Sequence, residues 1–155
     1  MADSIEAREL PEQYVLGIRM KTDIAHLPVS IGTMYHELFG YLGARQIQPL
    51  GMPYAEYFEV CEKVVDVECG VAVPPGAQGE GRIVARVIPG AKTLCAVHVG
   101  PYETMTSTYA KIDAWIGEKG YAYAGSPREV YHSDPQKDKD SSKWVTEIFW
   151  PVRKV

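Results

Sequence analysis

A single carboxylate stands in the middle of an apolar segment near the C-terminus. The segment WVTEIFWPV runs from Trp144 to Val152, and its only charged side chain is Glu147. Burying an unpaired carboxylate is costly in free energy. Either strand alternation turns Glu147 toward water, or the carboxylate serves as a ligand anchor or as a general base.

The alternation of side chains along a strand divides this segment into two faces. We expect the face with Thr146 and Ile148 to pack against a helix, and the face with Glu147 to point away from it. The neighbours of Glu147 on its own face are Val145 and Phe149. A carboxylate between apolar side chains is typical of the wall of an apolar cavity, so we favour a ligand role over a solvent-exposed charge.

Aromatic side chains supply the rest of a predicted binding site. The chain has 10 Tyr, 3 Trp and 3 Phe, many of them at predicted strands and strand ends. Tyrosine can line a pocket and still offer a hydroxyl group. Aromatic faces with one carboxylate would suit lipophilic cations or planar heteroaromatic molecules. The predicted ligand-binding residues are Glu147, Tyr102, Phe149, Tyr57, Tyr131, Trp115 and His98.

Several of these residues also have a purely structural interpretation. Tyr102 follows a Gly-Pro turn, and its hydroxyl either enters the site or packs at the start of a helix. His98 is either a buried, hydrogen-bonded histidine or a neighbour of the site. Trp115 either caps the site or packs a helix onto the sheet, and Tyr57 and Tyr131 are either paired walls or ordinary strand residues.

Composition excludes several classes of protein. The 155-residue chain has a net charge of −4 and no basic block, which argues against a nucleic-acid surface. No apolar run approaches the roughly 20 residues that span a bilayer. No pair of His or Cys has metal-ligand spacing, so we expect no metal and no cofactor. Three cysteines without CxxC spacing predict buried thiols in a reducing compartment, and thus a cytoplasmic protein.

A duplication organises the elements that would position the site. Two amphipathic helices are predicted, around residues 30–43 and 105–120, and their apolar residues recur at a constant offset of 74 residues, from Ile31 to Met105 and from Tyr35 to Tyr109. The flanking strands repeat as well, and they align Glu68 with Glu147. Because Asp66 and Gly70 share the face of Glu68, we expect Glu68 to face solvent; a second acid in the site is the alternative.

The fold class that follows is α+β, with two tandem β-α-β-β units in one domain spanning 1–155. The first repeat covers about 13–74, a Pro- and Gly-rich linker covers 75–81, and the second repeat covers about 82–152. We expect a mostly antiparallel sheet with both helices on one face and a ligand cleft between the two halves.

Three motifs, in order, resemble the GyrI-like small-molecule-binding superfamily. They are His-x-Gly-Pro-Tyr at 98–102, Gly-x-Pro-x-x-x-Tyr at 125–131, and a Glu on the last strand before Pro151. The resemblance extends over about 13–152. It implies a tandem β-α-β-β fold with a central cleft, and a ligand-facing Glu at Glu147.

The resemblance also implies candidate functions. This superfamily includes effector-binding domains of AraC-type and multidrug-sensing regulators, gyrase-inhibitor-like proteins, and standalone members that hydrolyse cyclopropanoid genotoxins with a Glu and a Tyr. The chain is similar to the standalone kind. We expect a hydrophobic or cationic small molecule as ligand, with Glu147 and Tyr102 as the catalytic pair if hydrolysis occurs. A gyrase inhibitor or an effector-sensing partner of a transcription regulator is the alternative, and the oligomeric state stays open.

Overall fold

The computed structural model describes residues 4–155 and contains nine strands and two α-helices within them. Contacts divide the chain into two compact units. Unit 1 comprises residues 4–11 and 90–155, and unit 2 comprises residues 12–89. Every strand pairing within each unit is antiparallel, which confirms the α+β class with mostly antiparallel strands.

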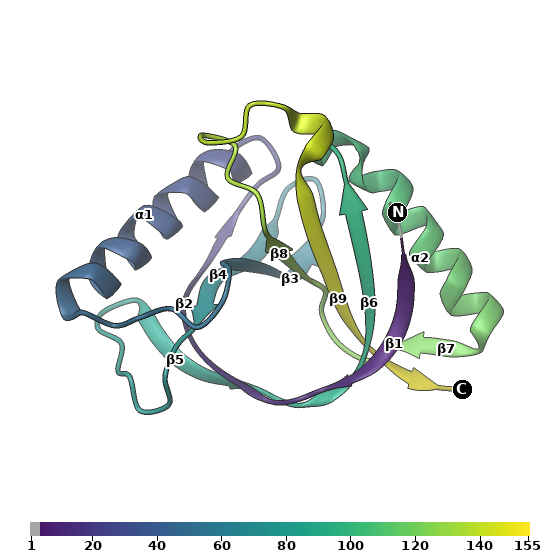
Figure 1. The fold of residues 1–155 in the computed structure, drawn as a ribbon, viewed down its shortest axis with the longest axis horizontal. Coiled ribbons are helices and arrows are strands. Elements are labelled where there is room, and N and C mark those ends of the chain that lie inside the picture. The colour runs from purple at the N-terminus through teal and green to yellow at the C-terminus, as the bar shows by residue number, and fades with distance from the viewer. Residues whose placement is uncertain (1–3) are drawn as a thin grey trace. The chain divides into compact units, whose positions relative to one another are not determined.

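Unit 2 holds four strands and helix α1. Its strands are β2 (Gln13–Thr22), β3 (Tyr54–Val60), β4 (Val65–Ala72) and β5 (Ile83–Ile88), hydrogen-bonded in the order β5-β2-β4-β3. Helix α1 (Leu27–Arg45) lies alongside these strands (Figure 1). Its buried side chains are Met34, Leu38 and Leu42, which recur every four residues as one helical face.

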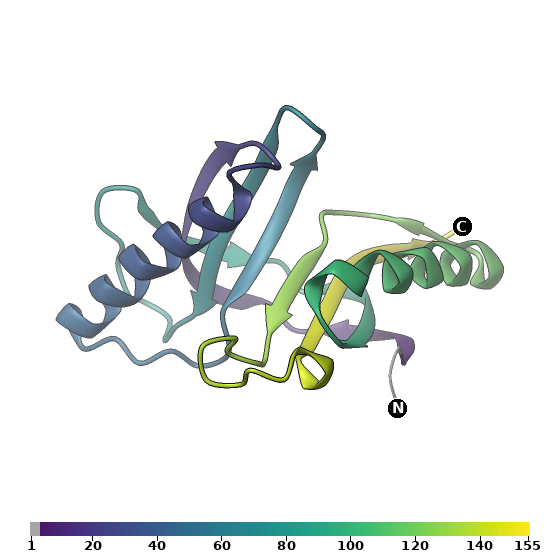
Figure 2. The same cartoon turned by 90° about the horizontal axis from the view of Figure 1, so that it is seen from above.

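Unit 1 repeats this plan. Strands β1 (Ile5–Leu10), β6 (Ala91–Val99), β9 (Val145–Lys154) and β8 (Arg128–Tyr131) pair in that order, and β7 (Tyr121–Tyr123) pairs with the end of β9. Helix α2 (Met105–Lys119) follows the short 3-10 helix η1 (Tyr102–Thr104), and a second one, η2 (Ser141–Lys143), precedes β9. Seen from above, each helix runs along its own strands (Figure 2).

The helix-facing residues of β6 and β9 form the core of unit 1 with α2. Leu94, Ala96 and Ile148 pack there against Ile112 and other α2 residues, all nearly inaccessible to water. Each fully buried aliphatic side chain contributes roughly 1.5–3 kcal/mol. The predicted division of β9 into two faces is therefore confirmed, since Thr146 and Ile148 are buried beneath the helix.

Each unit takes its outer strand from outside its own β-α-β-β segment. Strand β1 precedes β2 in the chain by two residues but pairs with β6, and β5 pairs with β2 although it precedes β6. The strand at 82–88, which the sequence placed in the second repeat, thus belongs to the sheet of unit 2. Pro11 lies between β1 and β2, and the Pro89-Gly90 pair lies between β5 and β6.

Two expectations about individual residues were wrong. Glu68 is only 5% exposed, because Arg86 and Tyr54 bind its carboxylate and pay for its burial. Cys61 is exposed at the β3–β4 connection, whereas Cys69 and Cys95 are buried as expected. Neither α1 nor α2 combines the length and apolar content needed to cross a membrane.

Gly70 is required by this packing. A Cβ atom at Gly70 would lie 2.5 Å from the Tyr54 hydroxyl and 2.8 Å from the Leu16 carbonyl oxygen. We expect Gly70→Ala to destabilise the protein by roughly 1–3 kcal/mol, because backbone and a bonded hydroxyl must move apart. Denaturant unfolding measures this loss.

Gly40 provides the matched control. It lies inside α1, and an added Cβ would meet no atom within 4 Å. Gly40→Ala should stabilise the protein by up to about 1 kcal/mol, because Ala favours the helix. A Gly70→Ala protein as stable as the wild type would contradict the packing described here.

Candidate functional site

A carboxylate on the helix side of unit 1 is held by two tyrosines. The Tyr109 hydroxyl of α2 donates to Glu129 Oε2 at 2.5 Å, and the Tyr131 hydroxyl of β8 donates to Glu129 Oε1 at 2.8 Å. Glu129 and Tyr131 share a face because they are two residues apart on one strand. This face is the helix side, since Glu129 pairs with Ile148 and Tyr131 with Thr146.

The Glu129 carboxyl is protonated more readily in this environment than a carboxyl group in water. Burial raises the pKa of the Glu129 carboxyl above its usual value, while the hydrogen bonds from Tyr109 and Tyr131 and the nearby His98 partly counteract that rise. Both hydrogen-bond donors are phenol groups, which stabilise the carboxylate without neutralising its charge. Glu129 is thus suited to attract a positive charge or to accept a proton.

Aromatic rings extend outward from this carboxylate. The Tyr109 ring meets Trp150 edge-on, with centroids 6.1 Å apart. On the other side, the Tyr102 ring lies 5.8 Å from Tyr131 and 5.0 Å from Trp144. Tyr102 is 38% exposed, so this end of the aromatic group is open to solvent. We call Glu129, Tyr109, Tyr131, Tyr102 and Trp144 the tyrosine–glutamate site.

A buried histidine holds the turn that carries Tyr102. His98 Nε2 lies 3.1 Å from the Pro101 carbonyl oxygen, which can only accept, so Nε2 carries the proton. His98 Nδ1 forms a hydrogen bond with the Thr108 hydroxyl at 2.7 Å. Gly100 has φ of +136°, a conformation that favours glycine, and its N–H donates to the Trp144 carbonyl. Strand β6, helix α2 and the Tyr102 turn are therefore fixed together.

The structure places Glu147 on the opposite side of β9. Its carboxylate lies 2.7 Å from His132 Nε2, and its side chain is 26% exposed. It points away from α2, as alternation predicted. Phe149 shares this face. The guanidinium carbon of Arg128 lies over the Phe149 ring, 5.9 Å from the ring centroid. Glu147 and Phe149 are therefore separated by the sheet from Tyr102, Tyr131 and His98.

The two remaining predicted residues are Trp115 and Tyr57. Trp115 packs against the unit 1 core and stacks on Tyr121, with centroids 5.3 Å apart. Tyr57 lies on β3 of unit 2. The expected ligand cleft between the halves stays a prediction.

Sequence reasoning missed Glu129. It counted Tyr109 among the apolar residues of a helix, and Tyr109 does pack against the unit 1 core while its hydroxyl bonds Glu129. A signal was present: Glu129 lies inside the Gly-x-Pro-x-x-x-Tyr motif, one alternation step from Tyr131. The duplication gives a second signal, because the 74-residue offset places Ala55 opposite Glu129 in the repeat. Because this residue is an alanine, unit 2 has no acid at the corresponding position, and the Ala55 side chain is completely buried.

Unit 2 instead carries charges on the face away from α1. Arg86 Nη2 lies 2.5 Å from Glu68 Oε1 and 2.8 Å from Glu56 Oε1, and the Tyr54 hydroxyl donates to Glu68. Burial alone would lower the pKa of Arg86, but the bonds to both carboxylates outweigh it and raise the pKa. These acids are paired with a cation, in contrast to the phenol-bound Glu129.

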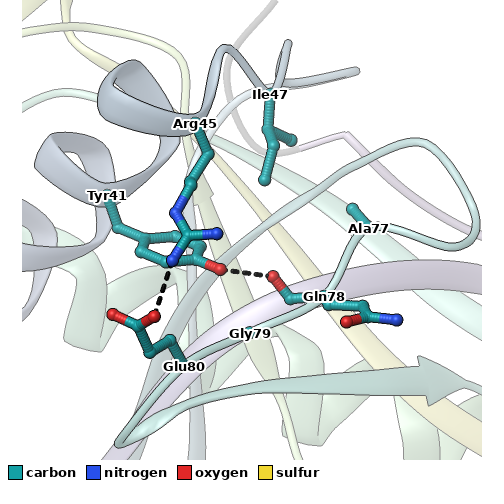
Figure 3. Close-up of a pocket in the computed structure, with 7 residues that line it drawn as sticks. All are labelled: Tyr41, Arg45, Ile47, Ala77, Gln78, Gly79 and Glu80. Carbon is teal, nitrogen blue, oxygen red and sulfur yellow. Dashed lines mark hydrogen bonds and ion pairs between the residues drawn. The ribbon is translucent and has the colours of Figure 1, made fainter.

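Unit 2 also has a pocket of about 420 Å³ between the end of α1 and the 74–81 linker (Figure 3). The Tyr41 hydroxyl donates to the Gln78 carbonyl at 2.6 Å, and Arg45 pairs with Glu80 at 2.6 Å. Its polar groups bind one another and are exposed, so we do not assign it a ligand. Among residues 4–155, no cluster of His, Cys, Asp and Glu is arranged to hold a metal ion.

Comparison with solved structures supports the fold. The crystal structure of the EcmrR C-terminal domain matches with a TM-score of 0.84 and 29% identity, and covers all of both chains. The cryo-EM structure of an EcmrR–DNA complex matches with a TM-score of 0.81 and 29% identity, and the present chain spans 59% of that protein. SAV2435 bound to tetraphenylphosphonium has the same fold, with a TM-score of 0.65 at 12% identity over 97% of this chain and 94% of that one.

Comparison of sequences gives the family. A protein named DNA gyrase inhibitor from Erwinia billingiae (strain Eb661) is 28% identical over 124 residues, which are 79% of this chain and 76% of that protein. The model of the GyrI-like small molecule binding domain matches residues 3–153, nearly the whole chain. The resemblance inferred from the three motifs is confirmed, and the chain belongs to the GyrI-like small molecule binding domain family.

Proposed function

We propose that this protein binds lipophilic aromatic cations in the tyrosine–glutamate site, with Glu129 as the anionic anchor. The observation that carries the proposal is a carboxylate of raised pKa whose hydrogen bonds come from two tyrosine hydroxyls. A carboxylate held this way keeps its attraction for a cation, because no arginine or lysine donates those two bonds.

The aromatic rings supply the second half of the recognition. A cation above an aromatic face gains about 0.5–2 kcal/mol, and more when water is excluded. Tyr131 bonds Glu129, its ring contacts Tyr102, and Tyr102 contacts Trp144, so aromatic rings continue outward from the carboxylate. An aromatic cation can therefore satisfy the carboxylate and stack on the rings at once, whereas a small hydrated ion gains only the first of these interactions.

Glu147 is the competing anchor, on the opposite face of β9. Its flanking residues Val145 and Phe149 support that role, and its pairing with His132 opposes it, because the pair partly satisfies the carboxylate. The two acids can be distinguished by matched substitutions.

Replacing Glu129 should weaken cation binding. We expect Glu129→Gln to raise the Kd for tetraphenylphosphonium roughly 10- to 100-fold, since interactions with a charged group are worth about 1.5–3 kcal/mol. Glu147→Gln should leave the Kd within about twofold if Glu129 is the anchor. Isothermal titration calorimetry measures both, and Glu118→Gln on the exposed side of α2 controls for the loss of one charge. The opposite ranking of the two variants would transfer the anchor to Glu147.

Binding should also depend on pH. The free Glu129 carboxyl has a raised pKa, and a bound cation lowers that pKa, so binding releases a proton. Affinity should therefore rise as pH increases through the raised pKa of the free protein and level off above it. Titrations between about pH 4.5 and about pH 8 test this. In Glu129→Gln the slope should vanish; a wild-type Kd that is constant over this range contradicts the role of Glu129.

Hydrolysis of cyclopropanoid genotoxins is the second candidate, favoured by the same carboxylate. With a raised pKa, Glu129 can take a proton from water while the hydroxide forms a bond to the strained carbon. The ring C–C bond breaks, and its electron pair moves into the conjugated carbonyl of the substrate, which becomes a phenolate. A tyrosine hydroxyl stabilises this phenolate oxygen by donating a hydrogen bond to it. Incubation with a cyclopropanoid dienone, followed by chromatography, should show catalytic formation of the hydrated product if this function holds. Gyrase inhibition and partnership with a transcription regulator stay predictions.

A further inference from the structure

A threonine of β9 has a buried hydroxyl without a partner. Thr146 is 0% exposed, and its Oγ1 atom makes no hydrogen bond, which distinguishes it among the buried side chains of the described residues. Leaving a buried hydroxyl unpaired costs about 1–3 kcal/mol. A valine has almost the same shape and avoids this cost, so the packing of β9 does not account for the hydroxyl.

Thr146 lies in the same layer as the tyrosine–glutamate site. The strand register places it directly between His98 on β6 and Tyr131 on β8, on the face that α2 covers. Glu129 is diagonal to it, one alternation step along β8. Side chains in such positions lie within about 5–8 Å of one another.

The polar neighbours of Thr146 are engaged in other bonds. The His98 ring bonds Pro101 through one nitrogen and Thr108 through the other. The Tyr131 hydroxyl donates to Glu129. The polar side chains that pair with Thr146 on the two neighbouring strands thus bond other groups, and a hydrogen-bonding group of a ligand would give its hydroxyl a partner.

We propose that Thr146 is a specificity-determining residue that hydrogen-bonds a polar substituent on the aromatic cation. This inference rests on the proposed function and narrows its ligand class to aromatic cations that carry a hydroxyl, amine or carbonyl group on a ring. Tyr102 marks the exposed end of the site, because its ring is 38% exposed and contacts Tyr131 and Trp144. A ligand ring that stacks on Tyr131 would lie next to Thr146, because Tyr131 and Thr146 pair across β8 and β9.

A pair of probes that differ by one hydroxyl tests the inference. The probes are tetraphenylphosphonium and (4-hydroxyphenyl)triphenylphosphonium, titrated into the wild type, Thr146→Val and Thr146→Ser. The wild type should bind the hydroxylated probe about tenfold more tightly, as expected for one buried hydrogen bond that satisfies an unpaired group. Thr146→Val should lose this preference while its Kd for tetraphenylphosphonium stays the same. Thr146→Ser, which keeps the hydroxyl, should retain the preference.

Stability without ligand provides an independent readout. Because Thr146→Val removes an unpaired buried hydroxyl, its Tm should rise above that of the wild type. A merely structural hydroxyl would have the opposite effect, so a lowered Tm for Thr146→Val overturns the inference. Equal affinity of the wild type for the two probes also overturns it, while leaving Glu129-dependent cation binding intact. If neither probe binds, the proposed function fails and this inference fails with it.

Discussion

The two-residue period of strands β8 and β9 is the constraint on which the candidate site depends. Alternation sends Glu129, Tyr131 and Thr146 toward α2, and it sends Glu147 to the other side of the sheet. A shift of β9 by one residue against its neighbours would bring Glu147 under the helix and turn Thr146 away from it. The register is held because the helix-side residues Thr146 and Ile148 are completely buried, whereas Glu147 retains contact with water.

Two different solutions to the burial of a carboxylate occur in the two units. In unit 2, Glu68 is neutralised by Arg86, and the pair forms a satisfied polar cluster. In unit 1, phenol hydroxyls bind Glu129 and leave its charge in place. The first arrangement contributes to folding and offers little to a ligand. In the second, neither of these two hydrogen bonds brings a positive charge, and burial raises the pKa of the Glu129 carboxyl.

The two repeats differ at the position of this acid. The tyrosines recur in both halves, with Tyr35 corresponding to Tyr109 and Tyr57 to Tyr131. The acid does not recur, because Ala55 occupies the position of Glu129 and is fully buried. In unit 2 the Tyr35 hydroxyl therefore bonds the backbone carbonyl of Tyr54, whereas its counterpart Tyr109 bonds a carboxylate. The two units thus share a fold and differ in the side chain at this position, which is Glu129 in one and Ala55 in the other.

The sequence by itself determined the elements and their faces. Helical and strand periods, the 74-residue offset and the Gly-Pro turn before Tyr102 follow from local backbone and burial preferences, and the three motifs sufficed to recognise the family. The sequence did not reveal with which strands β1 and β5 pair. It also did not reveal which acidic side chain is hydrogen-bonded by the tyrosines. Those depend on pairings between residues far apart in the chain, such as Glu129 with Tyr109, and on whether a buried charge meets an arginine or a phenol. Only the tertiary structure decides such pairings. Segments far apart in the chain can form hydrogen bonds and bury one another's side chains only when the strands pair in one register.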